Sequence, residues 1–170
     1  AEHAFDSGAR LGKVVVDATG DGDVAAAGGA EFKWGRESDN LGQPMTMFFE
    51  MADVNVDAIL EYIEKHPDDF EWTSRLYSRT PLPKTINQRY FVAQGYKKFV
   101  AQAKAAGDLH LGRETVLLQS TMRENTIVFN STRIGKLRGT DIDDFTKAEI
   151  EGRKQAMSLA GFMKKYVPGF

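Results

Sequence analysis

Hydrophobic residues change their spacing several times along the chain, and each spacing predicts a different kind of element. Three consecutive valines, Val14–Val16, form a short β-branched run, which is typical of a strand buried on both faces of a parallel sheet. Bulky residues over 45–51 predict another strand, whose three alternating methionines are expected to pack in the core. The β-rich runs 115–120 and 126–130 flank a polar turn over 122–125, which predicts a hairpin.

Apolar residues at helical spacing predict further elements. One helix covers 56–63, with Asp53 or Asn55 as its N-terminal cap and His66-Pro67 as its stop. A second helix ends at Gly107. Its apolar face consists of Tyr96, Phe99, Val100 and Ala103.

A long helix is predicted near the C-terminus, where Thr146 and Glu149 form a capping box. The residues expected to face inward are Ile150, Met157, Ala160 and Met163. Gly152 should weaken this helix by about 1 kcal/mol relative to alanine. The stretch 68–84, which contains Pro81-Leu-Pro83, is predicted to be mostly connection.

This order of elements predicts an α+β fold. The 45–51, 115–120 and 126–130 segments form an antiparallel sheet that helices cover on one face. The opening valine strand belongs to a different, parallel sheet.

Composition agrees with a folded domain and excludes several classes of site. The chain has 170 residues, 42% of them hydrophobic, which is enough to bury one core. Its formal net charge of −2 gives no reason to expect nucleic acid or an anionic membrane as a partner. Without cysteine the chain has no disulfide, thiolate metal site or cysteine nucleophile. No apolar run approaches the roughly twenty residues of a membrane span.

The valine strand leads into a glycine-rich acidic turn, which is the strongest candidate for chemistry. Gly20, Gly22 and Ala25 match the dinucleotide pattern G-x-G-x-x-A, and Asp23 is a plausible N-terminal cap for the helix that follows. However, the carboxylates of Asp21 and Asp23 would repel a pyrophosphate placed at this helix.

Other interpretations of the turn remain open. A calcium loop starting at Asp17 would need an acid where Gly28 stands. A phosphotransfer site would need an acidic partner where Thr19 stands. A last interpretation is that the turn is an ordinary connection between a strand and a helix and binds no ligand.

A family resemblance covers nearly the whole chain. The segment Asp17-Ala-Thr-Gly-Asp-Gly-Asp-Val-Ala-Ala-Ala-Gly-Gly-Ala30 resembles the DATGDGD signature of FAD-dependent oxidoreductases of the glutathione-reductase-like superfamily. Further segments look like landmarks of the same family in the same order. These are Gly35-Arg-Glu37, Gln43-Pro-Met-Thr-Met47, Asn130-Ser-Thr-Arg133, Thr146-Lys-Ala-Glu-Ile-Glu-Gly-Arg153 and Tyr166-Val-Pro-Gly-Phe170.

The resemblance implies FAD as the cofactor and a division of the chain into two parts. Residues 1–35 would be a strand-turn-helix remnant of a Rossmann-like FAD-binding domain, and residues 36–170 a substrate-binding domain. The family's opening G-x-G-x-x-G loop is not found here, so the chain is expected to be an internal piece that is inactive alone. Its expected partners are the remaining FAD domain and a small-molecule substrate. In such proteins the sheet of the substrate domain lies against the flavin ring.

Site residues follow from the same landmarks. The turn is expected to lie near the adenosine side of FAD, through Ala18, Thr19, Gly20, Asp21, Gly22 and Asp23. Arg133 is suited to pair with a substrate carboxylate or with a reduced flavin. The expected substrate-binding residues are Gln43, Thr46, Asn130 and Arg133. His3, His66 and His110 lack metal-site spacing, so no metal is expected and no catalytic residue is assigned.

Two other functions compete with the flavoenzyme. One is a non-enzymatic module that recognises a carbohydrate or another protein through an exposed sheet face. The other is a metal-dependent hydrolase that uses Asp17, Asp21 and Asp23, which their spacing disfavours.

Overall fold

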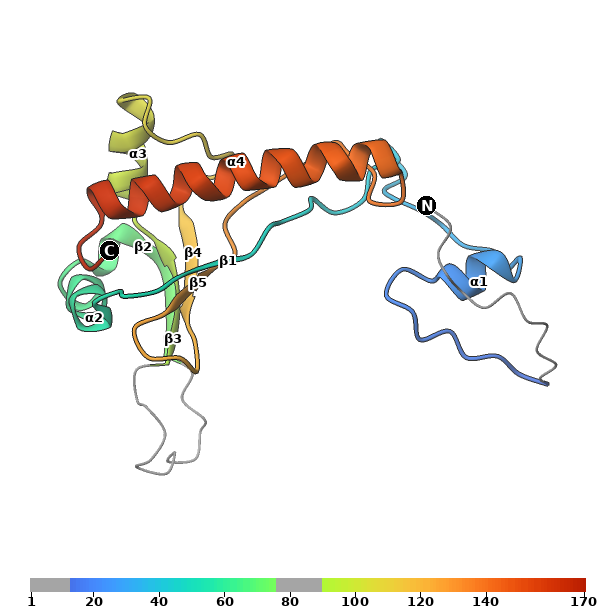
Figure 1. Cartoon of the computed structure of the whole chain (residues 1–170), viewed down its shortest axis with the longest axis horizontal. Coiled ribbons are helices and arrows are strands. Elements are labelled where there is room, and N and C mark those ends of the chain that lie inside the picture. The colour runs from blue at the N-terminus through green and yellow to red at the C-terminus, as the bar shows by residue number, and fades with distance from the viewer. Residues whose placement is uncertain (1–12, 76–89) are drawn as a thin grey trace. The chain divides into compact units, whose positions relative to one another are not determined.

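An antiparallel sheet organises the larger part of this protein. The computed structural model describes residues 13–75 and 90–170. The chain divides into two compact units, 1–42 and 43–170, and the sheet lies in the second. Within the described residues the strands are β1 (Phe49–Met51), β2 (Phe70–Arg75), β3 (Phe91–Gly95), β4 (Val116–Ser120) and β5 (Ile127–Phe129). They pair in the order β1-β5-β4-β3-β2, as Figure 1 shows.

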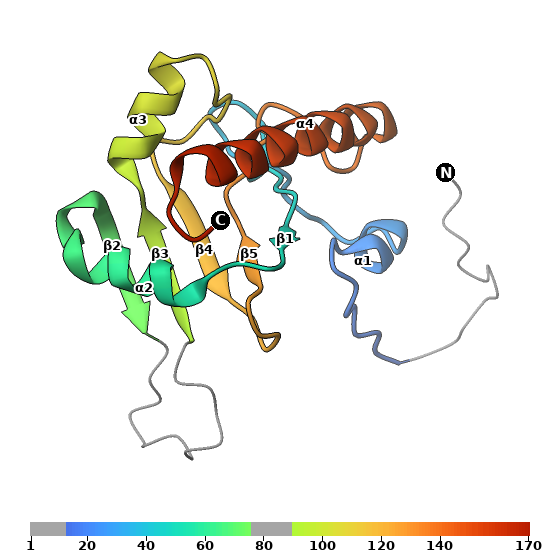
Figure 2. The same ribbon diagram turned by 60° about the vertical axis from the view of Figure 1, so that its left-hand side comes forward.

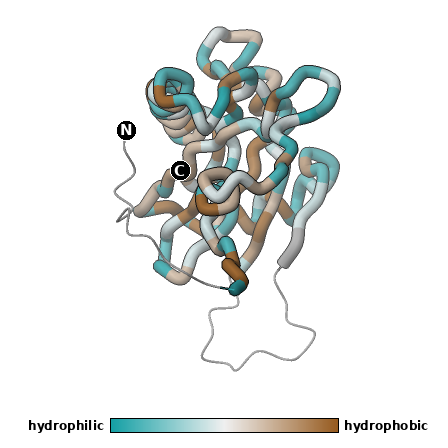
Figure 3. Tube along the Cα trace, turned by 90° about the vertical axis from the view of Figure 1, so that its right-hand side faces the viewer, coloured by the Kyte–Doolittle hydropathy of each residue, from teal (hydrophilic) through white to brown (hydrophobic). Residues whose placement is uncertain are grey.

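The pairing register gives the sheet one covered face and one open face. Phe129 lies opposite both Phe49 and Leu118, and the ring of Phe129 stacks on that of Phe49 with centroids 4.8 Å apart. Phe129 and Leu118 are fully buried, whereas the next row across the sheet, including Val128 and Gln119, is more accessible. Figure 3 shows apolar positions gathering along these strands. The α+β class predicted from the sequence is confirmed.

Three helices cover the buried face (Figures 1 and 2). They are α2 (Val56–Lys65), α3 (Lys97–Ala105) and α4 (Ile142–Tyr166). Each contributes to a single core with the strands, through Ile59 of α2, Val100 of α3 and Leu159 of α4, all fully buried. The helices therefore leave the other face of the sheet as the accessible one.

Local sequence signals position α2, α3 and the hairpin as predicted. Asn55 caps α2 by accepting a hydrogen bond from the backbone N–H of Ala58 at 3.1 Å, and α2 ends at His66. The helix α3 ends before Gly107, whose φ of +77° is costly for other residues. The strands β4 and β5 pair as a hairpin.

The prediction that 68–84 is mostly connection is wrong for its first part. Residues 70–75 form β2, which pairs with β3, a strand that the sequence pattern does not reveal. The rest of the predicted connection, 76–89, lies outside the described residues. Gly95 explains in part why the strand β3 is hard to predict from the sequence. A Cβ there would lie 2.1 Å from the ring of Phe70, so glycine, usually a sign of a strand end, is required for strand packing.

The long helix α4 starts earlier than predicted, and the predicted capping box is wrong. Asp141 caps the helix by accepting from the N–H of Asp144 at 2.9 Å. Thr146 lies inside the helix, where its hydroxyl donates to the carbonyl of Ile142 at 2.9 Å. Asp141, which precedes the predicted cap, therefore caps the N-terminus of α4.

Two of the four residues predicted to face inward on α4 are also misplaced. Ile150 is 52% and Met157 74% exposed, whereas Met163 is buried as predicted. The buried side consists of Ala148, Gly152, Ala156, Leu159, Phe162 and Met163. Small residues are buried because α4 passes close to the chain at this point. A Cβ on Gly152 would lie 3.2 Å from the Cβ of Met47.

The strands predicted at the start of the chain are shorter or not formed. The 45–51 strand is reduced to β1, with an isolated bridge between Met45 and Ile134 before it. Val14–Val16 form no strand, and each of the three valines is at least 71% exposed. No neighbouring strand pairs with them in the described part of the first unit, so their backbone groups have no ladder to join. The first unit contains one short helix, α1 (Asp23–Ala27).

A buried aspartate joins α2, β2 and α3. Asp69 is 1% exposed and accepts a hydrogen bond from the hydroxyl of Tyr62 at 2.9 Å. Its other oxygen accepts from the backbone N–H of Lys98 at 2.8 Å, in the first turn of α3. Asp69 therefore caps α3 although it lies far from that helix in the sequence.

We expect Asp69→Ala to lower the free energy of unfolding by about 2–3 kcal/mol, because it leaves two donors without their partner. Asp68→Ala removes an exposed neighbouring carboxylate and is the matched control, with an expected change below about 0.5 kcal/mol. Urea denaturation measures both. Equal stabilities of the two variants would contradict the role given to Asp69.

Candidate functional site

The candidate residues lie in both units, and each unit is described by itself. The acidic turn belongs to the first unit, whereas Gln43, Thr46, Asn130 and Arg133 belong to the second.

The carboxylate of Asp17 organises the acidic turn. Its Oδ1 accepts hydrogen bonds from the backbone N–H of Thr19 at 2.8 Å and from the Thr19 hydroxyl at 2.6 Å. Its Oδ2 accepts from the backbone N–H of Ala25, inside α1, at 2.8 Å. The Thr19 hydroxyl in turn accepts from the N–H of Asp23 at 3.0 Å. Asp17 and Thr19 thus cap α1 together.

The prediction that Asp23 caps this helix is wrong. Asp23 is the first residue of α1, and the preceding cap position is Gly22, with φ of +76°. A left-handed backbone at Gly22 turns the chain so that Asp17 reaches the helix. The N–H groups of Asp23 and Ala25 already donate to Thr19 and Asp17, so these two donors need no side-chain cap from Asp23.

These hydrogen bonds keep Asp17 ionised. The Thr19 hydroxyl is the main cause that lowers the pKa of Asp17, followed by the backbone N–H groups of Thr19 and Ala25. Hydrogen bonds to a charged carboxylate favour that charged form. The charge of Asp17 is therefore engaged within the turn.

The rest of the turn offers both donors and acceptors to a ligand. The backbone N–H groups of Gly20, Asp21, Gly22 and Val24 have no acceptor within the described residues. A Cβ on Gly20 would meet no atom within 4 Å. The side chains of Asp21 and Asp23 are exposed. The exposed carboxylates of Asp21 and Asp23 suit the ribose and ribitol hydroxyls of FAD, which donate hydrogen bonds, better than its negatively charged phosphates. The residues present therefore fit the hydroxyl-bearing part of FAD.

In the second unit the structure brings two predicted residues together. The hydroxyl of Thr46 lies 3.4 Å from Asn130 Oδ1 and 2.9 Å from the carbonyl of Thr132. Thr46 also lines a groove of about 290 Å³ beside the first half of α4. The other groove residues are Met45, Met47, Ile134, Phe145, Ala148 and Glu149.

The other two predicted residues are accessible and lack side-chain contacts of this kind. The side chains of Gln43 and Arg133 are exposed and have no polar partner in 43–75 or 90–170. The backbone of Arg133 is held by Gln155 of α4, which accepts from its N–H at 2.8 Å. The structure thus groups Thr46 with Asn130 and fixes the backbone of Arg133.

A second groove lies on the open face of the sheet, and sequence patterns did not reveal its residues. It encloses about 400 Å³ and contains Glu50, Tyr90, Val92, Gln119, Ser120, Thr121, Met122 and Val128. The register places Glu50, Val128, Gln119 and Val92 in one row across four strands. Val92 and Val128 are half-buried, and Glu50 and Gln119 are exposed. The row therefore combines apolar and polar side chains.

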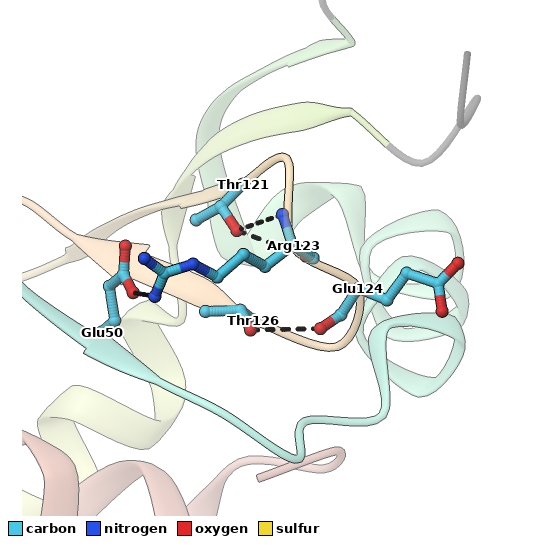
Figure 4. Close-up of polar contacts among 5 residues, drawn as sticks. All are labelled: Glu50, Thr121, Arg123, Glu124 and Thr126. Atoms are coloured by element: carbon cyan, nitrogen blue, oxygen red, sulfur yellow. Dashed lines mark hydrogen bonds and ion pairs between the residues drawn. The ribbon is translucent and has the colours of Figure 1, made fainter.

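The β4–β5 turn fixes one edge of this groove (Figure 4). Arg123 of the turn donates to Glu50 of β1 at 2.9 Å. The hydroxyl of Thr121 accepts from the N–H of Arg123 at 3.0 Å, and that of Thr126 donates to the carbonyl of Glu124 at 3.1 Å. These contacts stabilise the turn locally.

Further polar groups on the open face come from β2 and β3. The amide of Gln94 accepts from the indole N–H of Trp72 at 3.2 Å and donates to the hydroxyl of Thr115 at 3.0 Å. Gln94 also donates to Glu71. These strands were not predicted, so neither were these residues. Burial alternates along β3, but Phe91, Val92 and Ala93 are all apolar, so the sequence itself carries no alternating pattern that could have revealed this strand.

Comparison with known protein families gives the decisive observation. The family model described as FAD dependent oxidoreductase matches residues 4–170. This chain belongs to the FAD-dependent oxidoreductase family. No curated protein and no solved structure gives a significant match. Membership of this family implies FAD as the cofactor.

Within residues 13–75 and 90–170, no helix is long and apolar enough to cross a membrane. In the same residues, no group of three or more His, Cys, Asp or Glu side chains is placed to hold a metal ion.

We expect the turn to open as the pH falls through the lowered pKa of Asp17. The folded-state pKa is depressed, so the hydrogen bonds are intact above the ordinary pKa of aspartate and are lost below the lowered value. Titration followed by NMR should show the amide signals of Thr19 and Ala25 shifting with the Asp17 carboxyl.

Asp17→Asn should remove this titration and shift both amide signals at neutral pH. Asp21→Asn is the control, because the Asp21 side chain makes no such hydrogen bonds within the described residues. An Ala25 amide whose shift still titrates in Asp17→Asn would show that another group holds the turn.

Proposed function

We propose that this chain provides the substrate-binding part and a portion of the FAD site of an FAD-dependent oxidoreductase. The cofactor accepts a hydride from an organic substrate when it is bound. The residues of the chain bind and orient the substrate and contribute hydrogen bonds to FAD. The chain acts together with further FAD-binding structure that it does not itself provide.

The open face of the sheet is the observation that carries this proposal. Helices cover one face only, and the other presents a groove of about 400 Å³ with half-buried valines and exposed polar groups. A flat surface of this kind suits a planar ring or a small organic molecule, because apolar side chains support the body of the ligand and polar ones orient it. We assign this face to the flavin and the substrate.

The first unit supports the need for further structure. None of the described residues 13–42 is buried, and the valines of 14–16 are largely exposed. A segment that buries no side chain gains little hydrophobic stabilisation by itself. We propose that these valines form a strand of the complete FAD-binding domain, and that residues 18–23 then meet FAD near its adenosine side.

The second unit supplies the substrate-binding residues. Thr46 and Asn130 lie together, and Arg133 presents a guanidinium without a polar partner among residues 13–75 and 90–170. Neutral groups such as the Thr46 hydroxyl orient a substrate, whereas Arg133 pairs with negative charge on the substrate or the reduced flavin. Gln43, which is exposed at the start of the unit, completes the proposed set.

Visible absorbance tests the proposal directly. The chain is expressed alone and also within the longest natural polypeptide that contains it, and both are purified. We expect a flavin spectrum from the longer polypeptide and a weak or missing one from the chain alone. A longer polypeptide that is colourless and does not bind added FAD would overturn the proposal.

The variant Gly20→Val tests the role of the turn. A Cβ at Gly20 meets no atom within 4 Å and the φ of Gly20 is not left-handed, so the turn should keep its structure. The same side chain would occupy the space beside the free N–H groups. We expect FAD affinity of the longer polypeptide to fall about tenfold or more, which equals about 1.4 kcal/mol.

Gly112→Val is the matched control, because a Cβ at Gly112 also meets no atom within 4 Å. FAD fluorescence titration compares the two variants with the wild type. Unchanged affinity in Gly20→Val would remove residues 18–23 from the proposed FAD site.

A further inference from the structure

In residues 131–133, which follow β5, side chains make hydrogen bonds to the backbone that neighbouring strands would otherwise make. The hydroxyl of Ser131 accepts from the N–H of Leu117 and donates to its carbonyl, both at 2.8 Å. The hydroxyl of Thr132 accepts from the N–H of Met47 at 2.7 Å and lies 3.1 Å from its carbonyl. Both residues are fully buried. Satisfied buried polar groups of this kind fix one conformation of the backbone.

Gln155 extends this arrangement to the next residue. Its Oε1 accepts from the N–H of Arg133 at 2.8 Å, and its Nε2 donates to the carbonyl of Arg133 at 3.2 Å. Nε2 also donates to the carboxylate of Glu151 at 2.9 Å. A carboxylate accepts only from the NH₂ end of an amide, so Glu151 fixes the orientation of Gln155. The helix α4 thus holds both polar backbone groups of Arg133.

The side chain of Arg133 differs from those of several other arginines. Arg36, Arg123 and Arg153 each donate to a carboxylate. The guanidinium of Arg133 is exposed and has no polar partner within the described residues. The nearby Glu149 and Glu151 already accept from Arg153 and Gln155. A backbone held by α4 therefore presents an exposed guanidinium that has no polar partner within the described residues.

We propose that Arg133 binds an oxyanion group of the substrate, a carboxylate or a phosphate, and that Gln155 is the positioning residue that makes this binding possible. The planar fork of arginine matches both groups through two parallel hydrogen bonds. Holding the peptide of Arg133 reduces the conformational freedom that binding would otherwise have to remove. The identification of the ligand as substrate rests on the proposed function.

NMR of the arginine side chains tests this in the full chain. The Nε–Hε signal of Arg133, assigned by its loss in Arg133→Lys, is followed during titrations with sodium acetate and with inorganic phosphate at constant ionic strength. We expect a saturable shift of this signal, and the stronger of the two titrations identifies the oxyanion. A shift that stays linear, like that of Arg123, would overturn the oxyanion site.

Gln155→Ala tests the positioning role, with Gln102→Ala on an exposed position of α3 as the matched control. We expect Gln155→Ala to weaken oxyanion affinity about fivefold, as for the loss of about one hydrogen bond. Gln102→Ala should bind as the wild type. Unchanged affinity in a folded Gln155→Ala protein would overturn the positioning role.

Ser131→Ala separates positioning from general loosening of the segment. It removes the contacts with Leu117 but leaves Gln155 on Arg133. We expect near wild-type affinity, and a loss equal to that of Gln155→Ala would contradict a specific role for Gln155. Where Gln155→Ala does not fold, Gln155→Met serves instead, because it keeps an uncharged side chain of similar size and removes both contacts with the Arg133 backbone. Its affinity should also fall, and wild-type affinity would overturn the proposal.

The outcome is independent of the flavin experiment. Saturable binding at Arg133 in a protein whose longer form binds no FAD would leave an oxyanion site outside a flavoenzyme. A flavin spectrum without binding at Arg133 would reject the inference and retain the proposed function.

Discussion

The close packing of α4 on the covered face of the sheet is the constraint on which the rest of the structure depends. Its C-terminal half fills the core with Leu159, Phe162 and Met163. Its first half approaches the chain at Met47 closely, because Gly152 has no side chain. Glycine costs helix stability there, yet a larger residue would separate the helix from the 45–47 segment. The same helix carries Gln155, so the position of α4 also fixes the backbone at Arg133.

Because helices cover one face of the sheet, the groove of Glu50, Gln119 and the two valines lies on the other face. Open sheet surfaces with mixed polarity are favourable for small ligands, because apolar groups give area and a few polar groups give direction. In this member of the FAD-dependent oxidoreductase family, the row of Glu50, Gln119 and the two half-buried valines has this character. The ion pair of Glu50 with Arg123 is largely exposed and adds little stability. Its effect is mainly to hold the carboxylate at the edge of the groove.

The sequence predicted the structure correctly where local interactions decide it. The helix α2 and the hairpin of β4 and β5 form as predicted. Their signals are local: the cap Asn55, the apolar spacing of α2 and the polar turn between the two strands. The prediction failed where distant contacts decide. The strand β2 depends on its pairing with β3, and the buried face of α4 depends on small residues that fit against Met47. Gln155 gave no signal, because its partner Arg133 is 22 residues away.

The acidic turn shows why a motif does not assign roles to its members. Three aspartates, Asp17, Asp21 and Asp23, stand close together in the sequence and are chemically the same. The carboxylate of Asp17 accepts three hydrogen bonds within the turn, and these lower its pKa. A carboxylate used in this way builds the site but has little capacity left for a ligand. In the proposed FAD site, contact with the cofactor would therefore come from Asp21, Asp23 and the backbone N–H groups that have no acceptor within the described residues, while Asp17 holds the turn in place.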